Sequence, residues 1–178
     1  MRRVVTGHDD DGRSVVVQDG TAPRMHKFVG FPGFVSGLAW ATDPEQPVSR
    51  AGFDPTMAAE SFIPPPGGTR LLLMVIPPDA VMGSPDFDAA VFMAEQFEHG
   101  PGLAELFEAD GMHTTPTVDY TIVIDGEIWL EMDDGHLTRL TAGDIVVQNA
   151  TRHGWRNRSD KPTTLAAILI GAQRGTGA

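Results

Sequence analysis

Two stretches of this chain decide its fold, and both alternate β-branched runs with turn signals. Residues 111–126 read GMHTTPTVDYTIVIDG, and residues 143–157 read GDIVVQNATRHGWRN. The pair Asp125-Gly126 follows a β-branched run and is a strong hairpin signal. Short strands at this close spacing predict an antiparallel sandwich or barrel over residues 111–170.

The composition around these stretches fits one mostly β domain. The chain has 178 residues, 41% of them hydrophobic, with 20 glycines and 14 prolines. A chain of this size buries a sizeable core without help from a disulfide or a metal. It contains no cysteine, which excludes disulfides, thiolate zinc sites and iron–sulfur clusters. The lack of cysteine suits a reducing compartment, and we expect a cytoplasmic location.

The acidic net charge of the chain argues against some classes of binding partner. The net charge of −11 and the pI near 4.8 repel phosphate backbones, so we expect no nucleic-acid partner. No apolar run approaches the length of a membrane span, and none follows Arg2-Arg3 as in a signal peptide. We therefore expect a small-molecule substrate or ligand and no membrane association.

The chain from residue 1 to 178 is interpreted as a single domain with three parts. Residues 1–61 are expected to form an N-terminal hairpin and a wrapping segment, residues 62–110 a central strand with a helical insertion, and residues 111–170 the barrel core. The predicted strands of the first two parts are Arg2–Thr6, Ser14–Gln18, Val35–Ala41 and Thr69–Ile76. The hairpin is an exposed pairing edge, which predicts a homodimer. A frayed tail is expected from Gly171 to Ala178.

The helical insertion is predicted from a capping signal and an apolar stripe. Ser84-Pro85-Asp86 combines a capping residue, an early proline and an acid suited to the helix dipole. The stripe expected to face the core consists of Phe87, Val91, Met93, Ala94 and Phe97.

Strand parity selects the candidate site. His113, Thr115, Asp119 and Thr121 share odd parity and can face one side, whereas Tyr120, Ile122 and Ile124 face the other. In the later strand His153, Trp155 and Asn157 share a face. If both faces point inward, two imidazoles and one carboxylate converge, and such a set suits a divalent metal with open positions. Arg70, at the entry of a predicted central strand, is a candidate partner for a substrate carboxylate.

These residues resemble the two motifs of the cupin superfamily. In the first motif His113 matches the first histidine, Asp119 the acid and Gly126 the glycine that ends the strand. In the second motif the matches are Gly143-Asp144, His153 and Asn157. The resemblance implies an all-β, double-stranded β-helix (jelly-roll) barrel with one short helical insertion.

The chain departs from the cupin pattern at positions that bear on metal binding. Thr115 stands where the first motif has its second histidine, and Asp119 replaces a glutamate with a longer reach. Gln148 and Ala150 stand where proline and glycine are common, which concerns the turn. The resemblance therefore implies a degenerate metal set of His113, Asp119 and His153 for Fe, Mn, Ni or Zn, with no nucleotide or organic cofactor.

Three functions remain open for this site. The first is a metal-dependent enzyme of the dioxygenase, decarboxylase, isomerase or dehydratase/cyclase type, acting on an organic acid or aromatic metabolite. The second is a metal-free isomerase or epimerase in which His113 or His153 is the general base, oriented by Asp119. The third is a non-catalytic ligand-binding protein. In each, the pocket is expected to include Thr115, Thr121, Trp155, Asn157 and Arg70.

Overall fold

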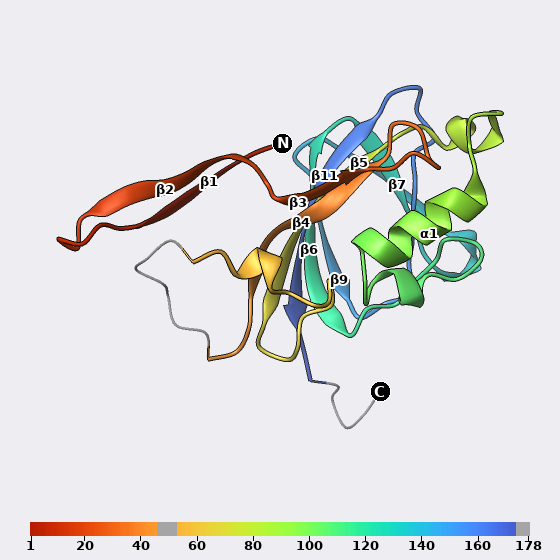
Figure 1. Ribbon diagram of the computed structural model, residues 1–178. Coiled ribbons are helices and arrows are strands. Elements are labelled where there is room, and N and C mark those ends of the chain that lie inside the picture. Colours follow the sequence, from red (N-terminus) through yellow and green to blue (C-terminus); the bar gives the residue numbers. More distant parts are fainter. Residues whose placement is uncertain (46–52, 174–178) are drawn as a thin grey trace.

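The computed structural model describes residues 1–45 and 53–173, and most of its regular secondary structure consists of β-strands (Figure 1). The strands are β1 Arg2–His8, β2 Ser14–Thr21, β3 Arg24–Lys27, β4 Val35–Thr42, β5 Thr69–Ile76, β6 Thr117–Asp125, β7 Glu127–Glu131, β8 Leu137–Thr141, β9 Ile145–Asn149, β10 Gly154–Arg156 and β11 Thr163–Gly171. The helix α1 spans Ala89–His99, and the 3₁₀ turns are η1 Pro55–Met57, η2 Asp79–Gly83, η3 Ala104–Leu106 and η4 Asp133–Gly135. The predicted all-β class with one helical insertion is confirmed.

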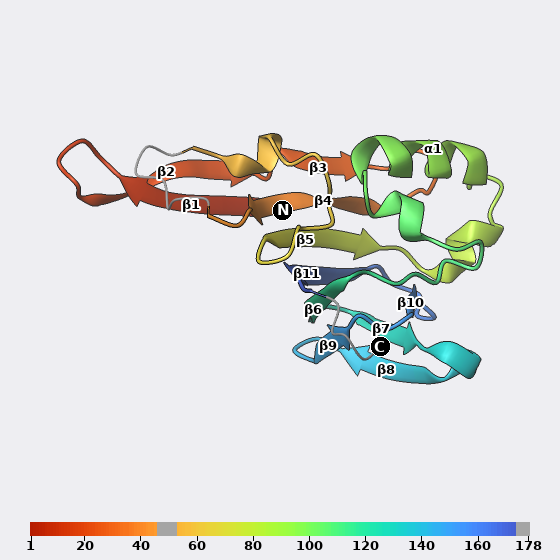
Figure 2. The ribbon, with the colours of Figure 1, turned by 90° about the horizontal axis from the view of Figure 1, so that it is seen from below.

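Two sheets form the framework of the domain. The larger sheet has six strands in the order β3-β4-β5-β11-β6-β9, and the smaller has three in the order β10-β7-β8 (Figure 2). Ile76, Val123 and Leu165 from the larger sheet share one buried cluster with Ile128 and Leu140 from the smaller. The sheets therefore pack face to face as a double-stranded β-helix, or jelly roll, although β3 and β9 remain open edges of the larger sheet.

The N-terminal hairpin stands apart from this framework. Within the described residues β1 and β2 pair with each other in a separate two-stranded sheet, and the hairpin extends outward beyond the larger sheet (Figures 1 and 2). Its base is fixed by Arg3, whose guanidinium donates to the carbonyl of Ala39 at 3.0 Å and pairs with Asp54 at 2.6 Å. The predicted hairpin is confirmed, with longer strands than the sequence indicated.

The central strand of the larger sheet was predicted with its observed bounds. β5 runs from Thr69 to Ile76 and lies between β4 and β11. By contrast, β3 was not predicted, because its sequence RMHK carries no apolar alternation. It pairs with β4 beside Gly37, where an added Cβ would lie 2.2 Å from the carbonyl oxygen of Arg24. A glycine is thus required for the two strands to approach.

The predicted start of the helix is wrong. Ser84-Pro85 follows the turn η2, and α1 begins only at Ala89. Its N-cap is Asp88, whose carboxylate accepts from the backbone N–H groups of Ala90 and Val91 at 3.0 Å each. The aspartate satisfies two of the free donors at the helix start, and this stabilises the later start.

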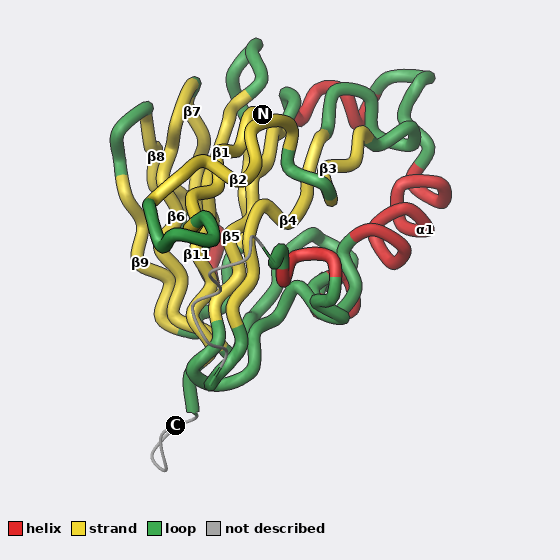
Figure 3. The backbone as a smooth tube through the Cα atoms, turned by 60° about the vertical axis from the view of Figure 1, so that its left-hand side comes forward, coloured by secondary structure: helices red, strands yellow, loops and turns green. Residues whose placement is uncertain are grey.

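The predicted apolar stripe of the helix is also wrong. Val91, Met93 and Phe97 are 40%, 41% and 48% exposed. The buried side instead carries Phe92 and Glu95. The Phe92 ring packs against those of Phe28, Phe31 and Phe34, and Glu95 accepts from the N–H groups of Val29 and Gly30. The 28–34 loop thus selects the buried face, and α1 lies to one side of the larger sheet (Figure 3).

The remaining expectations concern the two ends of the described ranges. β11 continues through Gly171, so the predicted tail begins later than expected, and residues 174–178 of that tail lie outside the described residues. Residues 46–52 of the predicted wrapping segment also lie outside them. Within residues 1–45 and 53–173, no helix is long and apolar enough to cross a membrane.

Candidate functional site

The inner face of β6 carries a row of polar side chains. Thr117, Asp119 and Thr121 are 0%, 4% and 3% exposed, and Thr115 just before the strand is 2% exposed. Tyr120, on the opposite parity, is 43% exposed. The predicted inward parity is confirmed. Burying these polar side chains costs free energy unless their polar atoms have hydrogen-bond partners, either in the protein or in a ligand.

His113 and His153 meet at the end of this row. Their backbones form an antiparallel bridge, with N–H to carbonyl distances of 2.9 Å in both directions. The imidazole centroids lie 4.3 Å apart at an angle of 48°. The ring of Phe107 lies 4.3 Å from that of His113 on the other side, and Trp155 meets His153 edge-on at 5.8 Å. Two histidines far apart in sequence thus share one buried, aromatic environment.

Both imidazoles are neutral at neutral pH. Burial, reinforced by the neighbouring His153, lowers the pKa of His113 to about 3. Burial also lowers the pKa of His153, against opposing contributions from the Thr151 carbonyl and the Asp119 carboxylate. Nδ1 of His153 lies 3.0 Å from the Thr151 carbonyl oxygen. A carbonyl can only accept, so Nδ1 carries the proton and Nε2 presents a lone pair.

Asp119 supplies the acid of the cluster. Burial raises the pKa of its carboxyl group, while the Thr117 and Thr115 hydroxyls and His153 act in the opposite direction. Thr115 donates to Oδ2 at 3.1 Å, whereas Oδ1 has no hydrogen-bond partner within the described residues. The Thr117 hydroxyl is near enough to favour the charged form, but it also lacks a partner in hydrogen-bonding geometry. Of the two carboxylate oxygens of Asp119, one thus has a hydrogen-bond partner in the described residues and the other has none.

The strand register adds Gln148, which was not among the predicted site residues. In β9 it lies directly opposite Asp119 and is 2% exposed. Its Oε1 accepts from the Thr151 hydroxyl at 2.6 Å, while Nε2 has no partner in the described part of the chain. The run Ile-Val-Val-Gln has no alternation of apolar and polar residues that would assign its side chains to the two faces of the sheet. The inward position of Gln148 therefore follows only from the pairing of β9 with β6.

The other predicted pocket residues separate into two groups. Thr115 and Thr121 lie on the inner face with Asp119, and Trp155 is half-buried beside His153. Arg70 is 3% exposed, but its guanidinium donates to the carbonyls of Ser61, Thr42 and Thr69 and pairs with Asp43. The side chain of Asn157 bonds the carbonyls of Ile76 and Lys161 and accepts from Ser159. Arg70 and Asn157 therefore hold the framework and do not extend the cluster.

The donor set does not fit a three-ligand metal site as it stands. Within the residues that the structure describes, no group of three or more His, Asp or Glu side chains is arranged to hold a metal ion. The predicted set of His113, Asp119 and His153 supplies two neutral imidazoles, the protonation state that metals require. However, Oδ2 of Asp119 accepts from Thr115, which occupies the position of the missing histidine.

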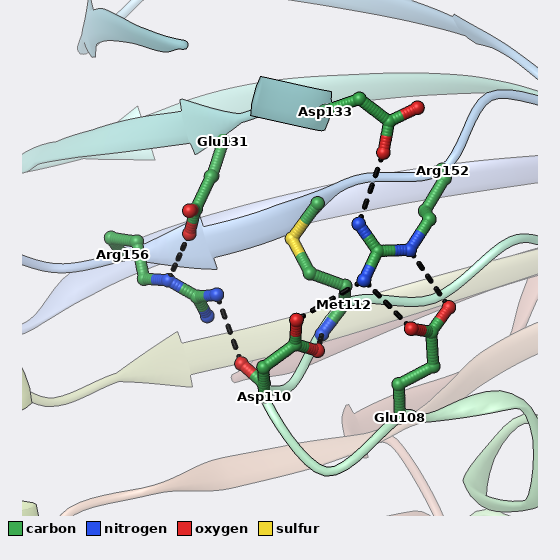
Figure 4. Close-up of polar contacts among 7 residues, drawn as sticks. All are labelled: Glu108, Asp110, Met112, Glu131, Asp133, Arg152 and Arg156. Atoms are coloured by element: carbon green, nitrogen blue, oxygen red, sulfur yellow. Dashed lines mark hydrogen bonds and ion pairs between the residues drawn. The ribbon is translucent and has the colours of Figure 1, made fainter. Parts of the chain in front are cut away.

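A network of ion pairs fastens the segment before His113, and the sequence analysis did not anticipate it (Figure 4). Arg152 pairs with Glu108 at 2.7 Å, Asp133 at 3.0 Å and Asp110 at 3.1 Å. Arg156 donates to Glu131 at 2.5 Å and to the carbonyl of Asp110 at 2.9 Å. Arg152 lowers the pKa of the Glu108 carboxyl, and the Met112 backbone N–H, together with Arg152, lowers the pKa of the Asp110 carboxyl. The network joins the 108–112 turn to β10 and so holds His113 against His153.

Two shallow hollows on the surface lie away from this cluster. One is lined by residues of β1 with Ala39, Trp40 and Leu71, and the other by residues at Gly126–Glu127, Thr141 and Ser159–Lys161. Neither contains a residue of the cluster. The unpartnered buried polar atoms locate the candidate site more directly, because surface hollows of this depth need no functional explanation.

Comparisons with known proteins match part of this chain to a protein family. Residues 107–170 match the family model described as "Cupin domain". The chain is similar to "Phomopsin biosynthesis cluster protein C'" of Diaporthe leptostromiformis, with 39% identity over 79 residues, covering 37% of this chain and 42% of that protein. It is also similar to "Cupin-domain-containing oxidoreductase fogC" of Aspergillus ruber, with 27% identity over 168 residues, covering 94% of this chain and 70% of that protein.

The solved structures that resemble the chain do so at low identity. A putative ethanolamine utilization protein from Salmonella typhimurium is 9% identical, with a TM-score of 0.43, and covers 97% of this chain and 98% of that chain. An RmlC-like cupin family protein from Methanocaldococcus jannaschii is 13% identical, with a TM-score of 0.40, and covers 60% and 73%. The match to the phomopsin-cluster relative spans less than half of that protein's length.

Proposed function

Since this chain carries a cupin domain at residues 107–170, we propose that it is a small-molecule enzyme whose chemistry is proton transfer at His153 and Asp119. The observation that carries the proposal is the bond between Nδ1 of His153 and the Thr151 carbonyl, at 3.0 Å. It fixes the tautomer that leaves Nε2 free to take a proton. A neutral imidazole with a fixed orientation is a suitable general base.

Asp119 supports this role through its charge. When Nε2 takes a proton, the nearby carboxylate stabilises the imidazolium, in line with its effect of raising the pKa of His153. His113, with a pKa of about 3, remains neutral and acts as a hydrogen-bonding group beside the base. A buried environment strengthens both interactions, because the local dielectric constant is low.

The reaction class that follows is removal and return of a proton next to a carbonyl group. Isomerisation and epimerisation next to a carbonyl group begin with this step, as do those dehydrations and cyclisations of an organic acid or aromatic metabolite that pass through an enolate. Two relatives are named as biosynthesis cluster proteins, one for phomopsin and one for oryzines. This favours a small metabolite as substrate for this chain as well.

Exchange of substrate protons with solvent tests the proposal without knowledge of the product. The purified chain would be incubated in D2O with a panel of oxo acids, hydroxy acids and aromatic ketones, and proton NMR would record the loss of C–H signals. We expect exchange with at least one compound and a fall of about 10²–10⁴-fold in His153→Gln, the usual contribution of general acid–base catalysis. His136→Gln, on an exposed turn, is the matched control. Equal exchange in wild type and His153→Gln contradicts the proposal.

A metal-dependent oxidoreductase is the second candidate. Its support is the pair of buried neutral imidazoles, together with three relatives that are named as cupin-domain-containing oxidoreductases. A His153 held at Nδ1 by a carbonyl also has the orientation that metal-bound histidines adopt. Elemental analysis after incubation with Fe(II), Mn, Ni or Zn tests this. Stoichiometric metal that is lost in His113→Ala and His153→Ala supports the second candidate, and no retained metal overturns it.

We also propose that the chain forms a homodimer through the β1–β2 hairpin. A two-stranded hairpin is marginal in water on its own, and Val4, Val15 and Val16 on it are 47%, 36% and 58% exposed. A second copy is a natural cover for these valines. Light scattering of the wild type should give the dimer mass, and Val16→Lys should shift the population to the monomer. A monomeric wild type contradicts the proposal.

A further inference from the structure

Four buried polar atoms lack a hydrogen-bond partner in the described residues, and all four belong to the candidate site. They are Nδ1 of His113, Oγ1 of Thr117, Oδ1 of Asp119 and Nε2 of Gln148. Their side chains are at least nine-tenths buried. Unpaired polar atoms in the interior are costly, and native proteins keep few of them. Their confinement to one buried cluster, formed by β6, β9 and the segment before β6, indicates that they are kept for a ligand.

The hydrogen bonds that do exist assign a role to each free atom. Oε1 of Gln148 accepts from the Thr151 hydroxyl, so the amide NH2 group points to the interior as a donor. Oδ2 of Asp119 accepts from Thr115, which leaves Oδ1 as an acceptor. An amide oriented the other way would direct Oε1 toward the carboxylate and create repulsion between two acceptors.

The strand register places this donor and this acceptor side by side. Gln148 and Asp119 are direct partners in the antiparallel pair β9–β6, so their side chains lie on the same face. Directly opposed residues have Cβ atoms about 4.5–5.5 Å apart. The free N–H groups and the free carboxylate oxygen therefore belong to neighbouring side chains on one inner face, and no hydrogen bond joins them.

We propose that Gln148 and Asp119 together bind a neutral hydroxyl group of the substrate. The hydroxyl oxygen accepts from Nε2 of Gln148, and its proton is donated to Oδ1 of Asp119. This inference rests on the proposed function, of which it specifies the substrate class: an alcohol, enol or phenol. A methyl ether cannot donate to Asp119, and a carboxylate is repelled by it, so any acidic group of the substrate lies elsewhere.

The pair acts by positioning the substrate, and its specificity is directly measurable. Saturation-transfer NMR on the purified full chain would compare phenol with anisole, and benzyl alcohol with benzyl methyl ether. We expect at least one hydroxyl compound to bind about tenfold or more tightly than its ether, because the ether leaves two buried groups unpaired. Equal binding within both pairs, or no binding of either hydroxyl compound, overturns the inference.

Two variants separate recognition from folding. Gln148→Met removes the donor and an unpaired polar group together, so we expect lost discrimination between hydroxyl and ether without a lower urea midpoint. Gln148→Glu keeps the acceptor for Thr151 and replaces the free donor, and it should also lose discrimination. Gln96→Met, on helix α1 and outside the cluster, is the control and should leave discrimination unchanged. Full discrimination in both Gln148 variants overturns the inference.

The deuterium-exchange experiment keeps this inference distinct from the proposed function. Hydroxyl discrimination with no exchange on any compound supports the binding pair and contradicts the proton-transfer function. Exchange that depends on His153 but is equal for hydroxyl and ether substrates, and unchanged in Gln148→Met, supports the function and overturns the pair.

Discussion

Two sets of buried polar side chains in the same jelly roll differ in how fully they are bonded. Arg70 donates to three backbone carbonyls, and Asn157 bonds two carbonyls and the serine at 159. Asp119 and Gln148 each have one side-chain atom bonded and one free. The sequence predicts all of them except Gln148 as pocket residues. The difference teaches that burial and polarity alone do not identify a site, whereas unsatisfied bonding capacity does.

The location of each set explains this difference. Arg70 enters β5 where the 42–43 and 61 backbone segments come close, and Asn157 follows β10 where β5 ends. Irregular backbone at these places leaves carbonyls that need donors. Asp119 and Gln148, which like Arg70 lie within paired strands, each keep one side-chain atom that no backbone group bonds. Their side chains are therefore free for another partner.

Replacement of Arg70 should break the comparison if its role has been misassigned. Arg70→Met removes the guanidinium that donates to the carbonyls of Thr42, Ser61 and Thr69 and that forms an ion pair with Asp43. We expect a loss of about 3 kcal/mol of unfolding free energy, because buried carbonyl groups lose a charged donor. Urea denaturation measures it. Arg139→Met, which removes a mostly exposed arginine, is the control. A cost similar to that of the control would move Arg70 out of the structural set.

Asn157 gives a second test on the same side of the comparison. Asn157→Ala removes the donor to Ile76 and Lys161 and the acceptor for Ser159. We expect a loss of about 2 kcal/mol, the cost of leaving buried groups unsatisfied. The matched variant is Gln148→Met, for which no loss is expected. Equal losses in urea denaturation would remove the distinction between the two sets.

The framework could be predicted from the sequence because its signals are local. The bounds of β5 and the hairpin at Asp125-Gly126 follow from apolar runs and turn residues that need no tertiary information. The helix illustrates the limit: Asp88 caps it instead of Ser84, and its less exposed side carries Phe92 with Glu95 instead of the predicted apolar stripe. Only the packing of Phe92 on the 28–34 loop decides between these two faces. Local patterns predict elements, and tertiary contacts select among equivalent faces.

The site could be predicted only in part. Parity within one strand suffices for His113, Thr115 and Asp119, since they follow one another along the same face. Gln148 needs the register between β6 and β9, and the Arg152 network needs the proximity of three separate turns. Neither is encoded in spacing. Whether a polar residue is bonded or free is likewise a property of its neighbours in space.

The next prediction concerns the pH dependence of stability and rests on His113, which also has an unpartnered buried atom, like Asp119 and Gln148. Its pKa of about 3 in the folded protein lies below the ordinary imidazole value of 6.5, so as the pH falls the unfolded chain takes up this proton before the folded one. Stability linked to this group is fully present above pH 6.5 and is lost as the pH falls toward 3. The slope is about 1.4 kcal/mol per pH unit.

Urea denaturation across this window measures the contribution of His113 by difference. His113→Gln should flatten the acid slope relative to wild type, whereas His136→Gln, on an exposed turn, should leave it unchanged. The comparison between variants cancels the carboxyl groups that titrate in the same range. An unaltered slope in His113→Gln would mean that the imidazole is not buried in its neutral form.

Asp119 should give the smallest effect and the opposite sign. Burial raises its folded pKa, so its contribution to stability is fully present below the unfolded value of 3.8 and is lost as the pH rises through the folded pKa. At neutral pH the carboxylate is therefore a cost to the fold. Asn keeps the acceptor for Thr115 and removes the charge, so Asp119→Asn should stabilise the chain by about 1 kcal/mol at neutral pH.

That gain should shrink toward acid, which separates it from a packing effect. Asp125→Asn, on the exposed end of β6, is the control and should change stability little. In the hydroxyl-discrimination experiment Asp119→Asn should bind the alcohol and its ether more equally, because the buried charged acceptor is gone. A variant that is both less stable and fully selective would place Asp119 with Arg70 and Asn157. A gain in stability with a loss of selectivity is the signature of a group kept for its ligand at the expense of the fold.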